Sequence, residues 1–307
     1  MKRILIEGIG LNPTYINQIL QDFVIKSNVN KFGGLRSLSI GNLYISKELS
    51  KTIFSDLLPQ LLALDIFNLK TNSTLSNTDI FGNLSCKIIE NTFRSRLVRL
   101  RITSMDMRSQ FETVIALINH SWKTLTDLDL SWCNLDYKCF HELYQCLKSA
   151  AIFDSQIYAQ NCMNGTLRSL NLSYNPFLVP NQLKQMRNEQ MSMLGKYSYS
   201  QGEKEMPDDV NNSDYSSSSD EPANQKEPEN FTQALLMLIK GHCLRKCTHL
   251  NISGIQAISS KNLIELAGEL IEYQNCQNLL SVHLSDLGIN QDAKLKEEIK
   301  DHFQFQE

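Results

Sequence analysis

The eleven-residue segment Leu125–Leu135 constrains the fold of this chain more than any other stretch. It reads LTDLDLSWCNL, with leucine at its first, fourth, sixth and eleventh positions and Cys133 at its ninth. Its middle alternates apolar, polar and apolar residues, which is typical of a short strand with one buried face. A small side chain at Cys133 can satisfy backbone groups where the chain turns, or pack inside as a weakly polar thiol. The segment therefore predicts a strand that ends in a turn.

The same pattern recurs along the chain. Leu167–Phe177 carries it in full, with Asn175 at the ninth position. Weaker copies are Met1–Leu11, Leu35–Ile45, Leu61–Thr71, Leu97–Met107, Cys247–Ala257 and Leu279–Ile289. These make eight copies in 307 residues. Such self-similarity predicts an array in which each unit packs on its neighbours.

The pattern resembles the leucine-rich repeat family, and specifically its long, ribonuclease-inhibitor-like subclass, over nearly the whole chain. The resemblance implies an α/β fold: a horseshoe-shaped solenoid of about eight repeats, with parallel strands on the concave face and helices on the convex face. In the weaker copies the asparagine or cysteine at the ninth position is replaced by Leu43, Leu69, Met105, Ile255 and Leu287. The fold predicts a binding surface but names no partner.

Segments with apolar residues at helical spacing follow the strands. We expect their inner faces to contain Ile16, Ile19, Leu20, Phe23 and Val24, then Leu49, Ile53, Phe54, Leu57 and Leu58, then Ile80, Leu84, Ile88, Ile89 and Phe93, then Phe111, Val114, Ile115 and Ile118, then Cys139, Phe140, Leu143, Tyr144 and Leu147, and finally Phe231, Leu235, Leu236, Leu238 and Ile239. Further helices are expected at 180–194 and, as a charged C-terminal cap, at 292–303.

An acidic, serine-rich segment at 197–230 interrupts the array. It contains nine acidic and two basic residues, three prolines and almost no aliphatic side chains. Such a segment cannot bury enough surface to offset its ordering entropy, so we predict disorder there. The chain then divides into repeats 1–6 at residues 1–196, the insertion at 197–230, and repeats 7 and 8 with the capping helix at 231–307.

Charge and composition restrict the location and the partners. A net charge of −3 argues against a general nucleic-acid binder, and no stretch approaches eighteen apolar residues, so we expect no membrane span. Eight cysteines, several at predicted core positions, suggest reduced buried thiols and hence an intracellular protein, cytoplasmic or cytoskeletal or ciliary, with the nucleus also open. The first strand begins at Met1, so either Lys2 and Arg3 keep its outer edge soluble, or another protein or an upstream segment covers it.

No catalytic motif stands out. The chain has no Walker loop, dinucleotide-binding glycine pattern, nucleophile elbow or zincin helix. A zinc site at His242, Cys243, Cys247 and His249 is conceivable, but Cys247 takes a core position and His249 should point to the opposite face. We therefore expect no enzyme activity, no cofactor, no metal and no small-molecule substrate.

The residues that alternate with the buried leucines are the candidate site. Strands about 4.8 Å apart place Arg101 between Asp65 and Asp129, and Arg99 beside Asp127. These charges either compensate one another or contact a partner. Phe67, Trp132 and Tyr174 lie near them and either fold back onto turns or act as binding anchors. Because the last copies present mostly serine and asparagine, we place the site at copies three to six.

These patterns favour a non-catalytic interaction scaffold that binds a protein partner, as part of a larger assembly, on its concave face. The alternative is a regulator of a small GTPase, because the subclass resembles the Ran GTPase-activating proteins, which also carry an acidic region. In this chain the acidic segment interrupts the array, and no catalytic motif matches residue by residue.

Overall fold

The computed structural model of the chain describes residues 2–8, 10–29, 34–71, 80–81, 95–157, 166–179, 227–240, 243–244, 246–258, 260–276 and 281–285. The helices expected at 180–194 and 292–303 lie outside these residues, as do Leu84, Ile88, Ile89, Phe93 and the insertion up to residue 226.

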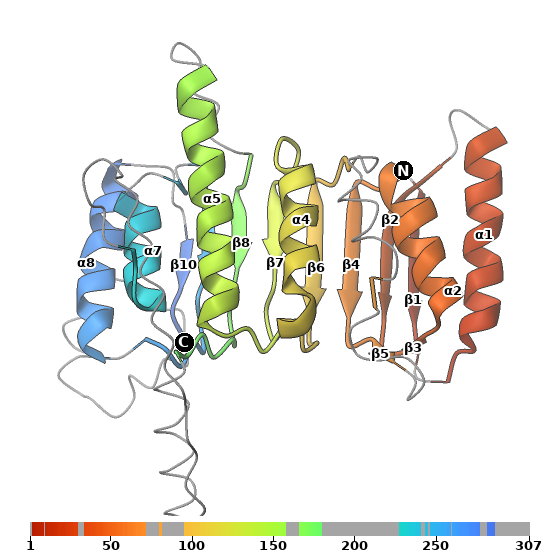
Figure 1. Ribbon diagram of the computed structural model, residues 1–307, viewed down its shortest axis with the longest axis horizontal. Helices are drawn as coiled ribbons and strands as arrows, with labels where there is room; N and C mark the ends of the chain where they lie inside the picture. The colour runs from red at the N-terminus through yellow and green to blue at the C-terminus, as the bar shows by residue number, and fades with distance from the viewer. Residues whose placement is uncertain are drawn as a thin grey trace, which may run out of the picture.

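Eight strands form one open sheet in which every neighbouring pair is parallel (Figure 1). Their order in the sheet is their order along the chain: β1 (Lys2–Glu7), β2 (Leu35–Gly41), β4 (Ala63–Phe67), β6 (Arg99–Thr103), β7 (Asp127–Asp129), β8 (Ser169–Asn171), β9 (His249–Asn251) and β10 (Ser281–His283). A second, two-stranded sheet pairs β3 (Tyr44–Ile45) with β5 (Lys70–Thr71). The predicted α/β class and the parallel strand arrangement are confirmed.

The register of the sheet confirms the predicted rows of outward residues. The central row runs through Leu5, Ser39, Asp65, Arg101, Asp129, Asn171, Asn251 and His283, each the partner of the next. Between these positions the aliphatic side chains point to the other face and are buried, apart from the partly buried Ile4, Ile6 and Val282 in the two edge strands. A one-residue slip would exchange the two faces, so the leucine pattern fixes the register.

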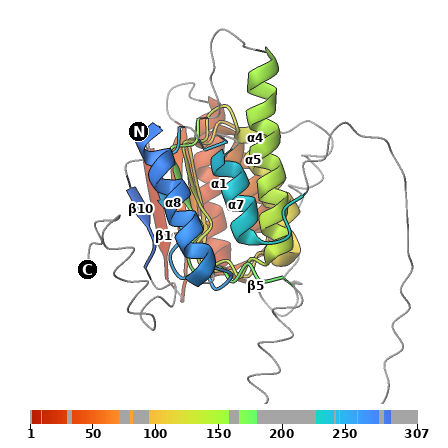
Figure 2. The same ribbon diagram turned by 90° about the vertical axis from the view of Figure 1, so that its left-hand side faces the viewer.

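Described helical segments connect every pair of neighbouring strands in the large sheet except β4 and β6, as parallel neighbours require. They are α1 (Pro13–Val29), α2 (Lys47–Lys51), the π-helix η1 (Thr52–Leu57), the 3-10 helix η2 (Leu58–Gln60), the 3-10 helix η4 (Arg108–Gln110), α4 (Phe111–Ser121), α5 (Tyr137–Ile157), α7 (Phe231–Lys240) and α8 (Ser260–Cys276). The described helices lie on one face of the sheet (Figures 1 and 2).

Polar side chains start several of these helices. The side-chain oxygens of Asn12, Ser46, Asp136 and Asn230 each accept a hydrogen bond from a backbone N–H in the first turn of α1, α2, α5 and α7. Each bond satisfies one of the donors that a helix start leaves without a partner. Pro13 takes the first position of α1, where its missing N–H has no helical partner to lose.

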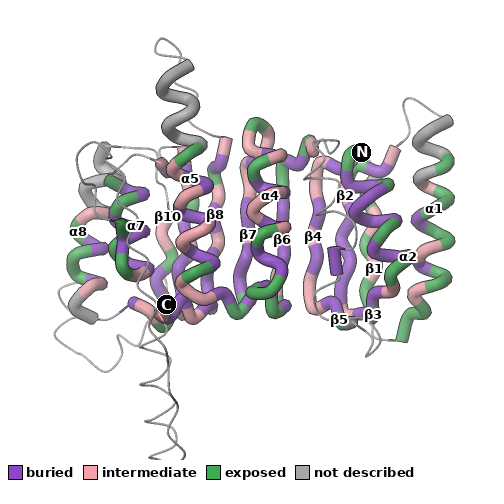
Figure 3. Tube along the Cα trace, viewed as in Figure 1, coloured by how far each residue is buried: buried purple, intermediate pink, exposed green. Residues whose placement is uncertain are grey.

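The core lies between the sheet and the helices (Figure 3). The predicted inner-face residues of the helices after β2, β6, β7 and β8 are buried, apart from a partly buried Ile115. The prediction is wrong for Ile19, which is 53% exposed, while Ile16 and Leu20 are buried. The cause is position: α1 packs on α2 and η1, and no described element lies on its outer side. β1 likewise forms an edge of the sheet, and its Leu5 side chain is 60% exposed.

The last four residues of the predicted insertion have a defined place. Pro228 is buried, and its carbonyl oxygen accepts a hydrogen bond from the Tyr137 hydroxyl on α5. The Glu227 carboxylate lies 3.7 Å from His141 Nε2 and accepts a hydrogen bond of 3.4 Å from Gln145 Nε2. These contacts attach residues 227–230 to the exposed side of α5, ahead of α7.

Candidate functional site

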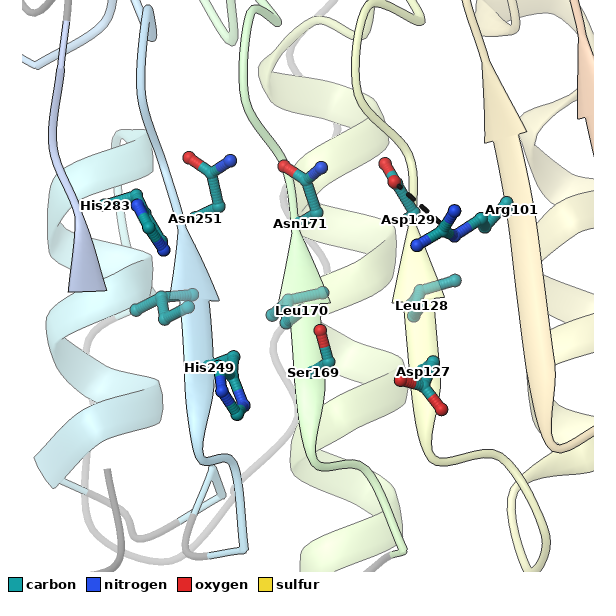
Figure 4. A pocket seen from close by; sticks show the side chains of 11 residues that line it. Arg101, Asp127, Leu128, Asp129, Ser169, Leu170, Asn171, His249, Asn251 and His283 are labelled. Atoms are coloured by element: carbon teal, nitrogen blue, oxygen red, sulfur yellow. Dashed lines mark ion pairs between the residues drawn. The ribbon is translucent and has the colours of Figure 1, made fainter. Parts of the chain in front are cut away.

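The outward face of strands β6 to β10 contains a shallow hollow of about 240 Å³ (Figure 4). Its polar side chains come from five neighbouring strands: Arg101, Asp127, Asp129, Ser169, Asn171, His249, Asn251 and His283. Five strands at about 4.8 Å spacing give it a length of about 19 Å across the sheet. It lies on the face of the sheet opposite the described helices (Figure 2).

Alternation along each strand builds this lining. In β7, Leu128 points into the core and is 1% exposed, while Asp127 and Asp129 on either side point outward. Leu170 and Leu250 repeat the arrangement in β8 and β9. Backbone atoms of the strands therefore form the bottom of the hollow, and every second side chain of a strand forms its sides.

Residues of the central row also stabilise the turns in which the strands end. Asp129 Oδ1 accepts hydrogen bonds from the Ser131 backbone N–H at 3.1 Å and the Ser131 hydroxyl at 2.8 Å. Asn171 makes the same two bonds with Ser173, at 3.1 and 2.8 Å. Asn251 accepts the Ser253 backbone N–H at 3.1 Å. These residues thus support the backbone turn as well as presenting polar groups outward.

The predicted charge compensation is only partly formed. Arg101 Nε lies 4.0 Å from Asp129 Oδ2, at the outer limit of an ion pair. Arg99 and Asp127 are register partners, yet among the described ion pairs none joins them. The Asp127 carboxylate instead accepts a hydrogen bond of 2.6 Å from the Thr126 hydroxyl. An exposed pair such as Arg101–Asp129 contributes only about 0–1 kcal/mol, so most of this charge is available for an external group.

Two histidines line the far end of the hollow. His249 is exposed on β9, and its Nδ1 lies 2.7 Å from the Thr248 hydroxyl, which directs Nε2 away from that contact. His283 is exposed on β10, in register with Asn251. In Figure 4, His249 and Asp127 lie in one row with Ser169 between them. The His249 imidazole and the Asp127 carboxylate therefore lie on either side of Ser169.

The eighth residue of successive eleven-residue segments has the same unusual backbone conformation. It is left-handed, with φ of +54°, +46°, +57°, +59°, +58° and +65°, at Asn42, Asn68, Ser104, Trp132, Tyr174 and Gly254. Trp132 and Tyr174 stack, with ring centroids 4.2 Å apart and planes 13° from parallel. The Tyr174 ring covers Gly254, because a Cβ atom there would lie 2.4 Å from it.

The aromatic residues thus divide between the two predicted alternatives. The Phe67 ring lies over Gly41 on β2, 2.4 Å from where a Cβ atom would stand, and so folds back onto the sheet. Tyr174 also covers a neighbouring backbone position, but as part of a stack. Trp132, at the free end of this stack, is 57% exposed. Trp132 is therefore the aromatic side chain in this region that presents the most surface for a partner.

Beneath the stack, the ninth position satisfies buried backbone groups. Asn175 is fully buried; its Oδ1 accepts from the N–H groups of Cys133 and Leu135 at 3.0 and 3.1 Å, and its Nδ2 donates to the carbonyls of Leu130 and Leu172 at 2.8 and 2.9 Å. The Cys133 thiol donates to the Ile102 carbonyl at 2.9 Å. Burial raises the pKa of Cys133 to about 12, so the thiol stays protonated. The predicted buried, turn-satisfying role is confirmed.

A second hollow of about 630 Å³ lies at the starts of α4 and α5 and carries both signs of charge. The Arg108 guanidinium donates to Asp106 at 2.6 and 3.1 Å and holds the pKa of that carboxyl below its usual range. Burial raises the pKa of Glu142, the opposite direction. In the part of the chain with assigned positions, no group of three or more His, Cys, Asp or Glu residues could hold a metal ion.

The zinc interpretation finds no support from the three ligands that can be placed, because Cys243, Cys247 and His249 belong to no described group of three or more residues that could hold a metal ion. Cys247 is buried and its thiol donates to a backbone carbonyl, while His249 is exposed on the strand. Their side chains diverge, as the alternation predicted, and His242 lies outside the described residues.

The structure brings together only part of the predicted site. Arg101, Asp127 and Asp129 line the first hollow, and Trp132 and Tyr174 stand where β7 and β8 end. Asp65, Phe67 and Arg99 lie outside the lining, and Asp65 accepts a hydrogen bond of 3.1 Å from Ser39.

Five lining residues were not among the predicted ones. Ser169 and Asn171 lie in copy six, inside the predicted region, whereas His249, Asn251 and His283 come from the last two copies, which the sequence analysis set aside as bland. The two histidines were the available signal, because both fall in the outward rows.

Comparison with known proteins adds no identity. A scan against protein-family models finds no match, and a search of curated proteins finds none either. Among the described helices, none is both long and apolar enough to cross a membrane. The function must therefore be inferred from the geometry of the face of the sheet opposite the described helices.

Proposed function

We propose that the chain is a leucine-rich repeat array of the long, ribonuclease-inhibitor-like kind, acting as a non-catalytic scaffold that binds a protein partner on the helix-free face of its sheet. The observation that carries this proposal is the continuous set of outward rows. Charged, amide, hydroxyl and imidazole side chains from neighbouring strands stand in register on a face that no described helix covers. Repeat arrays use such faces as extended binding surfaces.

The repeated backbone conformation supports the array. A left-handed residue recurs at the eighth position in six consecutive segments, and neighbouring segments exchange backbone hydrogen bonds there. Examples are the bonds from Trp132 N–H to the Ser173 carbonyl at 3.1 Å and from Tyr174 N–H to the Ser253 carbonyl at 2.8 Å. This regularity goes beyond the leucines from which the repeats were predicted.

The shape and lining of the first hollow favour a polypeptide over a small molecule. Its volume of about 240 Å³ falls below the roughly 300–1,000 Å³ of ordinary ligand pockets, and it is polar and open. It extends across five strands, so its contacts are spread rather than convergent. Its lining holds two carboxylates and one guanidinium, which is unlike the basic stripe of a nucleic-acid binder.

Site-specific photo-crosslinking tests this proposal. A photoreactive benzoylphenylalanine replaces Ser169 in the hollow or, as the matched control, Glu265 on the exposed side of α8. In extracts of the cells that express the protein, we expect a protein that crosslinks at 169 and not at 265. Binding of that protein, once purified, should weaken at least tenfold with Asp127→Ala. Equal crosslinking at both positions, or unchanged affinity, would place the contact elsewhere.

A further inference from the structure

Trp132 and Tyr174 occupy a backbone conformation that disfavours them. A left-handed φ is a genuine outlier for bulky residues, whereas glycine and asparagine adopt it readily. The equivalent positions hold Asn42, Asn68 and Gly254, with φ between +46° and +65°. The turn therefore forms without an aromatic ring. Strain kept at a position where a less strained residue would suffice is typical of a functional site.

The two rings form a preorganised surface. Tyr174 is held between Trp132, at 4.2 Å between centroids, and the Gly254 backbone. Trp132 stacks on Tyr174 and remains 57% exposed. A ring already fixed in place loses little conformational entropy when a partner packs against it.

Two carboxylates near this surface favour a positively charged partner group. The Asp127 carboxylate is half-buried at the wall of the hollow, and among the described residues no cation lies within 4.0 Å of it. Asp129, on the same strand, has Arg101 only at 4.0 Å. Trp132 follows Asp129 by three residues, in the turn directly after β7, so the carboxylates and the stack belong to one short stretch of chain.

Arginine is the side chain that suits both features. Its guanidinium stacks on aromatic faces and pairs with carboxylates through two hydrogen bonds, whereas an ammonium group acts as a point charge. Asp127 and Trp132 are five residues apart and the chain turns at Trp132, so their backbones lie at most about 17 Å from each other. Side chains on one side of an extended peptide recur about every 7 Å, so three alternate residues cover this span.

We propose that Asp127 and the Trp132–Tyr174 stack form a docking surface for an extended partner segment that carries arginines at alternate positions. This inference depends on the proposed function and narrows it to one class of partner sequence. Ser169 lies between Asp127 and His249, and Asn171 lies between Asp129 and Asn251; both offer hydrogen bonds to the backbone of the segment.

A matched pair of peptides tests the inference on the full chain. The probes are fluorescein-labelled Gly-Ser-Arg-Ser-Arg-Ser-Arg-Ser-Gly and the same peptide with citrulline, which keeps the shape of arginine without its charge. We expect the arginine peptide to bind at least tenfold more tightly in low salt, measured by fluorescence anisotropy. Equal affinities would overturn the inference.

Tryptophan emission locates the contact. The chain has two tryptophans, so in Trp122→Phe the emission comes from Trp132 alone. We expect the unlabelled arginine peptide to change this emission with the same midpoint as the anisotropy titration. Binding without any change at Trp132 would contradict the assigned surface.

Variants separate binding from folding. Trp132→Asn installs the residue that occupies positions 42 and 68, so we expect its melting temperature to be unchanged or higher while peptide affinity falls at least tenfold. Asp127→Asn should weaken the arginine peptide and leave the citrulline peptide unaffected. Tyr15→Ser removes a 66% exposed aromatic residue on α1 and should change neither affinity. A Trp132→Asn protein that melts lower and binds normally would assign Trp132 a structural role instead.

The two proposals fail in different ways. If the peptides do not bind but a partner crosslinks at position 169, the arginine preference is wrong and the scaffold function stands. If no partner crosslinks at 169 but the arginine peptide binds at Trp132, the arginine-binding surface stands and the hollow is not the partner contact.

Discussion

The ends of the strands are built differently in two regions of the molecule. In the N-terminal region, β1 to β4, the partly exposed eighth-position residues form a hydrogen-bonded ladder that ends on Glu7 of β1: Asn68 Nδ2 donates to Asn42 Oδ1 and Asn42 Nδ2 donates to Glu7 Oε1, both at 2.7 Å. In the middle region, β7 and β8, the same positions hold the stacked rings of Trp132 and Tyr174. The backbone is left-handed at all four positions.

The buried ninth positions reverse this difference. The N-terminal region places Leu43 and Leu69 there, 1% and 6% exposed, whereas the middle region places Cys133 and Asn175, both fully buried. One region is polar outside and apolar inside, and the other is aromatic outside and polar inside. The turn geometry therefore accepts polar or aromatic side chains at its exposed position, and apolar or polar ones at its buried position. The chemistry of the exposed row can therefore be set by a partner, whereas that of the buried row is set by local hydrogen bonding.

Asn175→Leu, which gives the middle region the interior of the N-terminal one, should have the largest effect. It removes the acceptor of the Cys133 and Leu135 N–H groups and the donor to two carbonyls. Four buried polar groups would lose a partner at about 1–3 kcal/mol each, so we expect a loss of at least about 4 kcal/mol in the free energy of unfolding.

Urea denaturation followed by circular dichroism measures this loss. Gln256→Leu, at an exposed turn position, is the matched control and should change the free energy of unfolding by less than about 0.5 kcal/mol. A similarly small change for Asn175→Leu would mean that the two interiors are interchangeable.

Gly254→Ala should have the second largest effect, because Gly254 is the backbone position that the Tyr174 ring covers. The new Cβ atom would lie 2.4 Å from the Tyr174 ring, at a backbone φ of +65°. Strain and displacement of the ring together should cost about 2–3 kcal/mol. Gly268→Ala in α8 meets nothing within 4 Å and should instead stabilise the helix by about 0.5–1 kcal/mol. Thermal unfolding of the two variants compares them, and opposite signs are required.

The strands and their rows could be predicted because alternation and leucine spacing encode them directly. Period-two alternation decides which residues of a strand point outward, and the repeated leucines align one strand with the next. Asp65, Arg101 and Asp129 therefore fall in one row, as expected. The same reasoning placed Cys133 and Asn175 inside the turns.

The left-handed row could not be predicted, because its occupants share no side-chain chemistry. The eighth position holds asparagine, serine, tryptophan, tyrosine or glycine, and these residues share only their backbone conformation. The stack depends on contact between neighbouring strands, which local sequence does not record. Ile19 has an apolar side chain at helical spacing, but it lies on the outer side of the terminal helix α1. The hollow at β6 to β10 was underestimated because serine and asparagine were judged by polarity alone, without the adjacent histidines.

Asn68→Trp, which moves an aromatic ring into the N-terminal ladder, should have the smallest effect and tests the origin of the difference most directly. It loses the hydrogen bond to Asn42 and places a bulky residue at φ +46°, next to Asn42 and Ser104, which offer no ring to stack upon. We expect a loss of about 1 kcal/mol in the free energy of unfolding and no gain in affinity for the arginine peptide, measured by denaturation and anisotropy. Because the backbone conformation is the same as at Trp132, the cost at position 68 measures the strain that the middle region carries. A tryptophan accepted at position 68 without loss would show that the conformation is indifferent to its side chain, and strain could then no longer distinguish Trp132 from its equivalents.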